Sequence, residues 1–299
     1  MINGTLIDSR PVALPEMTLS MARRSMRAED FARYSAVQMH ELTYWSEGLK
    51  IKAYLGLPPS EAQETQFPAL VFNAGGTGER GALSAVTAAA TVGLYASWGY
   101  VVVASQYRGR GGSEGTEEWG AGDVDDAMNA LLLLQSFGYV DTERIGLIGG
   151  SRGGMMALQM LTRTDIFKAA ITFGAPTEFT ELAEDSYILT TAKHFLPNHA
   201  DIRSELAKRS VTQYTDKLCK TTPLLVLHGS GDRRVEPEHA YKLGLALQKT
   251  LHPYKLIIYD NADHVLAGRR DESNAEMRSW VDVYVKSRAA LPRVGPHGA

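Results

Sequence analysis

From residue 68 onward, short apolar runs alternate with helix-like segments, and this alternation restricts the fold more than any other feature of the sequence. The runs are PALVFNA (68–74), YVVVASQY (100–107), RIGLIGG (144–150), FKAAITFG (167–174), TPLLVLHG (222–229) and YKLIIYD (254–260). Runs of this length that are almost continuously apolar are typical of strands buried on both faces. Such strands, separated by helices, predict an α/β fold with a doubly wound, mostly parallel sheet.

The rest of the chain is arranged around this sheet. Residues 1–15 read as a loose arm, 16–37 as an amphipathic helix, and HELTYWSEGLKIKAYLGLP (40–58) as an antiparallel hairpin that turns at Ser46-Glu47-Gly48. Residues 175–221 interrupt the alternation with a long, partly helical segment, which predicts a cap over the strand ends. We therefore expect an N-terminal arm and helix over 1–40, one α/β domain over 41–290, and a C-terminal tail over 291–299.

Composition excludes several classes of protein. The chain has 299 residues, 44% hydrophobic residues and a net charge of −3, so nothing favours nucleic acid or an anionic membrane as a partner. The single cysteine, Cys219, permits no internal disulfide, which fits a reducing compartment. No signal peptide and no apolar window of about 18 residues is evident. We expect a soluble, cytoplasmic protein with no membrane partner, and the sequence leaves a homo-oligomer open.

Two segments match the pattern G-x-S-x-G, at residues 111–115 and 149–153. The pattern marks a nucleophilic serine only where a strand leads into the serine and a helix starts directly after it. Ser151 meets this condition, because it follows the run that ends at Gly150 and precedes the apolar helical segment GGMMALQMLTR. Ser113 follows its strand by several loop residues and precedes a glycine-rich stretch, so we interpret it as a loop residue.

A serine hydroxyl needs a base, and the base needs an acid that orients it. In doubly wound hydrolases these residues follow in the order serine, acid, histidine. His264 is the best candidate for the base, because it lies in a loop just past the last strand. Asp232, four residues beyond the strand that ends at His228, is the preferred acid, and we interpret His228 itself as a buried structural residue.

The other acids near His264 leave an alternative open. Asp260 and Asp263 are closer to it in sequence than Asp232 is, but such neighbours usually shape the loop. The oxyanion requires two backbone N–H donors. The candidates are the amide of Arg152, which follows the serine, and the amide of Gly76, in the loop after the first parallel strand.

Taken together, the chain resembles the α/β-hydrolase superfamily, and more narrowly the catalytic domain of prolyl-oligopeptidase-type (S9) serine hydrolases and their dienelactone-hydrolase-like relatives. The resemblance spans about residues 42–285, and the segments that carry it are YWSEGLKIKAYLGLP, VFNAGG, YRGRGGSEG, DVDDAMNAL, RIGLIGGSRGGMMAL, LLVLHGSGDRRVEP and NADHVL. It implies the α/β-hydrolase fold and a glycine-rich Tyr-Arg-Gly loop, where Arg108 would pair with an acid such as Asp123 or Asp126 as a structural brace.

Two departures from these relatives bear on the function. Ala74 stands where they often carry His or Tyr before the Gly-Gly of the oxyanion loop, and the sequence contains no propeller that would filter substrates by size. We therefore expect a carboxylesterase-like serine hydrolase that cleaves an ester of a small or medium molecule through an acyl-enzyme. No cofactor is implied, and no His or Cys cluster has the spacing of a metal site.

Two other functions stay open. The first is an S9-like peptidase or aminopeptidase that acts on short peptides, which a carboxylate placed to bind a free amine would favour. Glu178, Glu181 and Glu184 in the insertion are candidates for this carboxylate, although charge on the surface of a helix is the preferred explanation for them. The second is a catalytically silent α/β-hydrolase scaffold used for binding, against which the complete set of Ser151, Asp232 and His264 argues.

Overall fold

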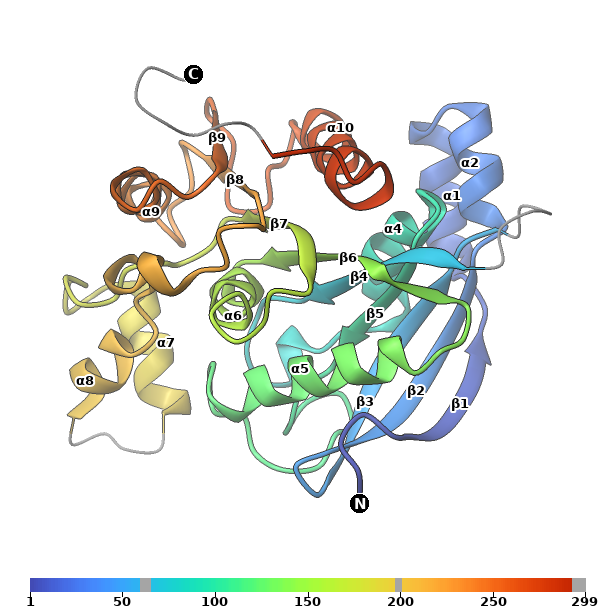
Figure 1. Cartoon of the computed structure of the whole chain (residues 1–299), viewed down its shortest axis with the longest axis horizontal. Coiled ribbons are helices and arrows are strands. Elements are labelled where there is room, and N and C mark those ends of the chain that lie inside the picture. The colour runs from blue at the N-terminus through green and yellow to red at the C-terminus, as the bar shows by residue number, and fades with distance from the viewer. Residues whose placement is uncertain (60–65, 197–200, 292–299) are drawn as a thin grey trace. The chain divides into compact units, whose positions relative to one another are not determined.

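The structure, a computed structural model, describes residues 1–59, 66–196 and 201–291 (Figure 1). The chain divides into two compact units. The first consists of Met1–Glu117 and Gly122–Ile145, and the second consists of Glu118–Ala121 and the chain from Gly146 onward.

The first unit contains the N-terminal strands, which are β1 (Leu6–Val12), β2 (Gln38–Ser46), β3 (Leu49–Leu57), β4 (Phe67–Asn73) and β5 (Val101–Ser105). Their order in the sheet is β1-β2-β3-β5-β4. The pairs β1–β2, β2–β3 and β3–β5 are antiparallel, and β4–β5 is parallel. The predicted hairpin is therefore confirmed. Its register ends at Ser46 opposite Leu49, which leaves Glu47 and Gly48, with φ of 49° and 81°, as a tight turn of the type that suits the twist of two strands.

Besides a 3-10 turn over Glu79–Gly81, the described residues of the same unit form five α-helices. They are α1 (Glu16–Ser25), α2 (Ala28–Ser35), α3 (Ala85–Ala88), α4 (Leu94–Ser97), which a π turn over Ala89–Gly93 joins to α3, and α5 (Gly122–Gln135). The expectation of one helix over 16–37 was wrong, because Met26 and Arg27 are extended, with ψ of 155° and 154°, and separate α1 from α2. The expectation of a loose arm was also wrong. Backbone hydrogen bonds to β2 hold β1 at the sheet edge, and its exposed side chains carry no apolar pattern.

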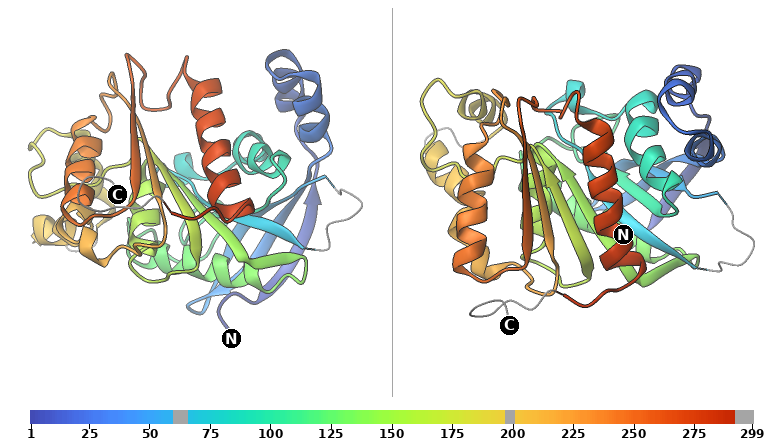
Figure 2. Two further views of the ribbon diagram at one scale, coloured as in Figure 1. Left: turned by 45° about the horizontal axis from the view of Figure 1, so that its top comes forward. Right: turned by 90° about the horizontal axis from the view of Figure 1, so that it is seen from above.

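Strand β6 (Val140–Gly150) carries the chain from the first unit into the second. The second unit continues with the parallel strands β7 (Phe167–Phe173), β8 (Leu224–Gly229) and β9 (Tyr254–Tyr259), in the order β6-β7-β8-β9. Its long helices are α6 (Arg152–Met160), α9 (Glu238–Lys249) and α10 (Arg270–Val281), followed by a π turn over Asp282–Lys286. Figure 2 shows α10 on one face of these strands and α9 on the other. Strands β7 and β8 are buried almost throughout, as their continuous apolar runs predict.

The insertion between β7 and β8 is helical, as predicted. It contains α7 (Tyr187–Phe195), α8 (Ile202–Ala207) and two single 3-10 turns, Val211–Gln213 and Thr215–Lys217. Helices α7 and α8 lie together in Figure 1. Residues 197–200 of the insertion and 292–299 of the predicted tail lie outside the described residues. The expected domain boundaries at residues 40 and 290 stay a prediction.

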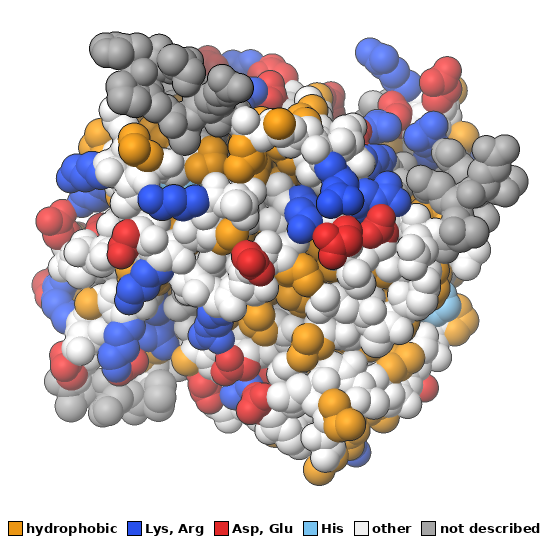
Figure 3. Space-filling model, viewed as in Figure 1, with side chains coloured by type: hydrophobic (Ala, Val, Ile, Leu, Met, Phe, Trp, Pro, Cys, Tyr) orange, Lys and Arg blue, Asp and Glu red, His pale blue; other side chains and the backbone are white. Residues whose placement is uncertain are grey.

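Strands flanked by helices on both faces, an N-terminal antiparallel hairpin and a helical insertion after β7 together make the α/β-hydrolase fold. Within the described residues, no helix is both long enough and apolar enough to cross a lipid bilayer. On the face drawn in Figure 3, acidic and basic side chains lie interspersed, in keeping with the small net charge of −3.

Candidate active site

Ser151 lies on a sharp turn between β6 and α6. Its φ of 52° and ψ of −127° are unusual for a residue with a side chain, and its N–H donates to the carbonyl of Phe173 at 2.8 Å. Close packing at this turn requires glycine, because a Cβ on Gly149 would lie 2.4 Å from the carbonyl oxygen of Gly153. A strained serine between a strand and a helix is the geometry that exposes a nucleophilic hydroxyl.

The structure brings Asp232 and His264 together with Ser151, within the second unit. Nε2 of His264 lies 3.0 Å from the Ser151 hydroxyl oxygen, and Nδ1 lies 2.8 Å from Oδ2 of Asp232. Asp232 comes from the loop after β8 and His264 from the loop after β9. The three side chains therefore meet at the carboxyl ends of parallel strands, where ligands of such sheets bind.

Asp232 is held as a carboxylate by its neighbours. The residue is 3% exposed, and its Oδ1 accepts the backbone N–H groups of Arg234 and Val235 at 2.8 and 3.0 Å. Burial alone would raise the pKa of Asp232, but hydrogen bonds from His228, His264 and the Val235 amide outweigh it and hold the pKa well below its usual range. An ionised carboxylate behind Nδ1 of His264 fixes the tautomer in which Nε2 can accept a proton.

The two alternative acids are used elsewhere. Asp260 pairs with Arg269 at 2.6 Å, and Asp263 accepts the backbone N–H groups of Val265 and Ala267. Both carboxylates shape the loop around His264, as the sequence interpretation expected of them.

His228 has a role that sequence reasoning did not find. It is buried, as predicted, but its Nε2 lies 2.8 Å from the carbonyl oxygen of Val235 and 3.2 Å from Oδ2 of Asp232. It therefore bridges the end of β8 and the loop that carries Asp232. The available signal was its position, four residues before the acid at the end of the same strand.

The two candidates for the oxyanion site lie in different units, and both assignments stay predictions. Arg152 is the first residue of α6, so its amide belongs to the N-terminus of that helix, directly after Ser151. Gly76 lies in the loop after β4 with φ of 75°, and a Cβ there would lie 2.6 Å from the Cα of Gly81. A side chain at position 76 would therefore displace this loop.

The second G-x-S-x-G match is a loop, as predicted. No strand ends directly before Ser113 and no helix follows it, and its hydroxyl oxygen accepts the N–H of Lys52 at 2.9 Å. The predicted brace is also confirmed, with Asp126 as the acid. The Arg108 guanidinium donates to both carboxylate oxygens of Asp126 at 3.0 Å, and the Arg108 amide donates to Oδ2 at 2.8 Å.

Arg110, in the same loop, is a residue that sequence reasoning missed. It is 1% exposed, and its guanidinium donates to the carbonyl oxygens of Gly75 at 3.2 Å and Gly76 at 3.3 Å, and to that of Gly81. Hydrogen bonds from a buried guanidinium thus fix the backbone of the loop that contains Gly76. The only sequence signal was the second arginine of YRGR, two residues after Arg108.

This arrangement suits one kind of chemistry. A serine hydroxyl that is hydrogen-bonded to an imidazole, with a buried carboxylate behind that imidazole, can attack a carbonyl and pass its proton to the base. In the described parts of the chain, no group of three or more His, Cys, Asp or Glu side chains is placed to hold a metal ion. The fold and these side chains define a serine hydrolase of the α/β class.

The sequence also identifies the family. Residues 87–288 match the profile of the prolyl oligopeptidase family, Peptidase S9, so the chain belongs to this family. The resemblance expected from the sequence is confirmed.

The similar proteins include two from Bacillus subtilis. The uncharacterized peptidase YtmA is 28% identical over 233 residues, which cover 76% of this chain and 86% of YtmA. The uncharacterized peptidase YuxL is 29% identical over 273 residues, which cover 86% of this chain and 40% of YuxL.

Solved structures give the same result for the fold. A puromycin-hydrolyzing peptidase of Mycobacterium tuberculosis matches with a TM-score of 0.64 at 26% identity, over 80% of this chain and 38% of that one. The acylaminoacyl peptidase of Pyrococcus horikoshii matches with a TM-score of 0.71 at 20% identity, over 91% of this chain and 44% of that one. This chain thus spans most of YtmA and less than half of YuxL and of these two structures.

Proposed function

We propose that the protein is a serine peptidase that acts on short peptides, with Ser151 as nucleophile, His264 as base and Asp232 as the acid that orients it. The observation that carries this proposal is the chain of hydrogen bonds from Ser151 through His264 to Asp232, in a member of the prolyl oligopeptidase family.

The reaction would proceed through an acyl-enzyme. Ser151 Oγ attacks the peptide carbonyl while His264 Nε2 takes its proton, and the amides of Arg152 and Gly76 bind the oxyanion. The imidazolium then gives the proton to the leaving amine. A water molecule, deprotonated by the same imidazole, hydrolyses the ester to Ser151 and releases the acid.

The comparisons with known proteins favour a peptide substrate over the ester substrate that the sequence led us to expect. The expectation of an ester substrate rested on Ala74 and on the lack of a propeller in this sequence. The relatives YtmA and YuxL and the Mycobacterium tuberculosis structure, at 26% identity, are all named peptidases. Family membership therefore supports the peptidase alternative over the esterase. The hydrogen-bonded Ser151 argues against a silent binding scaffold.

A substrate panel tests the proposal. Aminoacyl and dipeptidyl p-nitroanilides are compared with p-nitrophenyl esters, each rate being divided by the uncatalysed rate of the same compound. We expect the larger acceleration for anilides, and a loss of about 10⁴-fold or more in kcat for Ser151→Ala. Ser113→Ala is the matched control and should keep activity within a few-fold. Acceleration confined to esters, or activity that survives in Ser151→Ala, would refute the peptidase proposal.

A further inference from the structure

A cavity of about 390 Å³ lies in the second unit, beside the loop that carries Asp232. Its wall comes from three places: the start of the insertion (178–187), residues 233 and 236 of the acid loop, and the first turns of α9. Neither Ser151 nor His264 lines it. The cavity is therefore separate from the reacting atoms but shares a wall with the loop that orients the base.

The charge of this cavity is strongly negative. Two cations line it, Arg233 and Lys242, and Lys242 already pairs with Glu181 at 2.6 Å and Glu238 at 2.9 Å. Three further carboxylates line it as well, which are those of Glu178, Asp185 and Glu236. Five carboxylates thus face two cations, and a cationic ligand would balance them.

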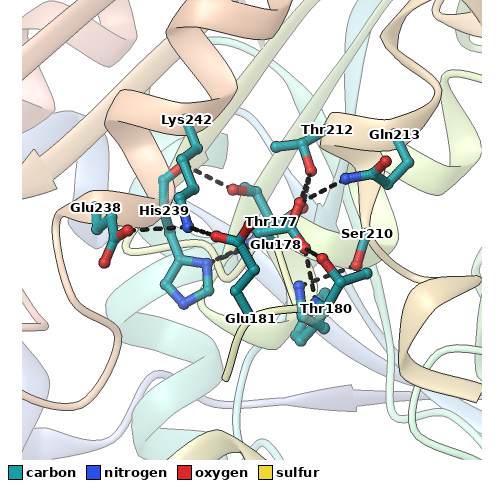
Figure 4. A network of polar contacts seen from close by, with 11 residues as sticks. Thr177, Glu178, Thr180, Glu181, Ser210, Thr212, Gln213, Glu238, His239 and Lys242 are labelled. Carbon is teal, nitrogen blue, oxygen red and sulfur yellow. Dashed lines mark hydrogen bonds and ion pairs between the residues drawn. The ribbon is translucent and has the colours of Figure 1, made fainter. Parts of the chain in front are cut away.

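Glu178 is a buried carboxylate whose hydrogen-bond partners are all uncharged. It accepts the N–H and hydroxyl of Thr180, the hydroxyl of Thr212, and the side-chain amide of Gln213 (Figure 4). Burial alone would raise the pKa of Glu178, but these hydrogen bonds outweigh it and lower the pKa to about 2. The carboxylates of Asp185 and Glu236 make no ion pair or side-chain hydrogen bond with the described residues.

His239 adds an independent sign of a ligand. It is 8% exposed, and its Nδ1 accepts the backbone N–H groups of Thr177 and Glu178, both at 3.2 Å. Nδ1 therefore carries no proton, and the neutral ring has its hydrogen on Nε2. Burial, together with His228, lowers the pKa of His239 to about 4, so the ring stays neutral at pH 7.

The Nε2–H group of His239 has no acceptor in the described part of the chain. Figure 4 shows this second ring nitrogen on the side of the ring away from the Thr177–Glu178 backbone. The N–H donor of a largely buried ring that lines a cavity and lacks an acceptor there is a feature that a ligand can satisfy.

We propose that this cavity binds the free amino terminus of a peptide. Glu178, Asp185 and Glu236 balance the charge of the ammonium group, and His239 Nε2–H donates to the carbonyl oxygen next to it. The assignment rests on the peptidase function proposed above and specifies its substrates as peptides with an unblocked amino terminus. Among the three glutamates considered from the sequence, it selects Glu178. Glu184 does not line the cavity and pairs with Arg203 and Lys193 instead.

Binding is measured by titration calorimetry with Ser151→Ala protein, so that no peptide is cleaved. The probes are Ala-Ala-Ala amide, its N-acetyl derivative, and N-acetyl-Ala-Lys-Ala amide, which carries its ammonium group on a side chain. The variants are Glu236→Gln, which changes an exposed residue, and His239→Asn, whose Oδ1 can accept the two backbone N–H groups while the Nε2–H donor is lost. Glu184→Gln is the matched control, and urea unfolding checks that each variant folds.

We expect the free amine peptide to bind at least about tenfold more tightly than its acetylated form. Glu236→Gln and His239→Asn should each reduce this advantage about threefold or more, and Glu184→Gln should leave it unchanged. Equal binding of the two alanine peptides, or an advantage that both variants retain, overturns the proposal. Equally tight binding of the lysine probe overturns the assignment to an amino terminus.

The two proposals can fail separately. One outcome is that the free amine peptide binds more tightly than its acetylated form and the variants reduce this advantage as predicted, but the wild-type protein cleaves no peptide bond. In that case the amine site stands and the peptidase function fails. If it cleaves acetylated and free peptides equally well, the peptidase function stands and the amine site fails.

Discussion

Four histidines of the second unit occupy four different hydrogen-bonding positions. His264 lies between a hydroxyl and a carboxylate, and His228 lies between a carbonyl and the same carboxylate. His239 accepts two backbone N–H groups, and Nε2 of buried His252 lies 3.0 Å from the carbonyl oxygen of Thr222, to which it donates. Both His239 and His252 are buried. Partner groups, rather than residue type, decide which of these rings can act as a base.

The buried His252 predicts a pH dependence of stability. Burial lowers the pKa of His252 to about 4, whereas the pKa in the unfolded chain is about 6.5. Between these values the unfolded chain binds the proton, so this residue lowers the free energy of unfolding as pH falls from about 6.5 to 4. His252→Gln keeps a donor for Thr222 but does not titrate.

Urea unfolding at pH 7.5 and pH 4.5 measures this effect. The loss of stability between these two pH values should be smaller in His252→Gln than in wild type, by on the order of 1–3 kcal/mol. A loss of the same size in both proteins would contradict the prediction.

At the scale of elements, the Arg108–Asp126 pair ties together three parts of the first unit. Asp126, on α5, is 0% exposed and accepts from Arg108 in the loop after β5 and from the Ser46 hydroxyl at the end of β2, at 2.6 Å. Burial raises the pKa of Asp126, and hydrogen bonds from Arg108 and Ser46 offset only part of this effect. The same loop carries Arg110, so the brace also supports the residue that holds the Gly75–Gly76 carbonyls.

Asp126→Asn should be strongly destabilising, because it removes the buried carboxylate to which the guanidinium and the amide of Arg108 donate hydrogen bonds. We expect a loss of about 3 kcal/mol or more in the free energy of unfolding, measured by urea denaturation at pH 7. Glu276→Gln is the control. It breaks the exposed pair with Lys255 and should cost less than about 1 kcal/mol. The double variant Arg108→Met/Asp126→Leu should regain part of the lost free energy of unfolding. If Asp126→Asn lowers the free energy of unfolding no more than the control does, the Arg108–Asp126 pair is not a structural brace.

At the scale of the whole molecule, the residues proposed for catalysis are distant in sequence and close in space. Ser151 and His264 are 113 positions apart and meet at 3.0 Å, with Asp232 from a third loop behind them. All three belong to the second unit, so their arrangement depends on the folding of that unit.

Labelling of Ser151 by a fluorophosphonate should therefore report the folding of the second unit. In a Trp45→Phe/Trp98→Phe background the remaining tryptophans, Trp119 and Trp280, lie in this unit. We expect the labelling rate and their fluorescence to fall at the same urea concentration, since a serine without its base is a poor nucleophile. Labelling that persists after the fluorescence transition would show that reactivity does not need the folded site.

The sequence alone determined the class of fold and the residues proposed for catalysis. Continuous apolar runs predict buried parallel strands because hydrophobic patterning is a local property of the sequence, and Ser151, Asp232 and His264 lie in the turn or loops that follow three of these strands. The choice of Ser151 over Ser113 was also local, since it depended on the strand before the serine and the helix after it. Strand β1 could not be found this way, because an exposed edge strand has no apolar pattern.

Only the tertiary structure decided which side chains share a partner. His228 contacts Asp232, Arg110 donates to the carbonyls of Gly75 and Gly76, and His239 lines an acidic cavity. Each of these contacts depends on loops that the sheet brings together. The local sequence pattern does not predict such contacts, because each of these polar residues could equally face solvent. Burial is what restricts it to one partner, and burial is a property of the folded chain.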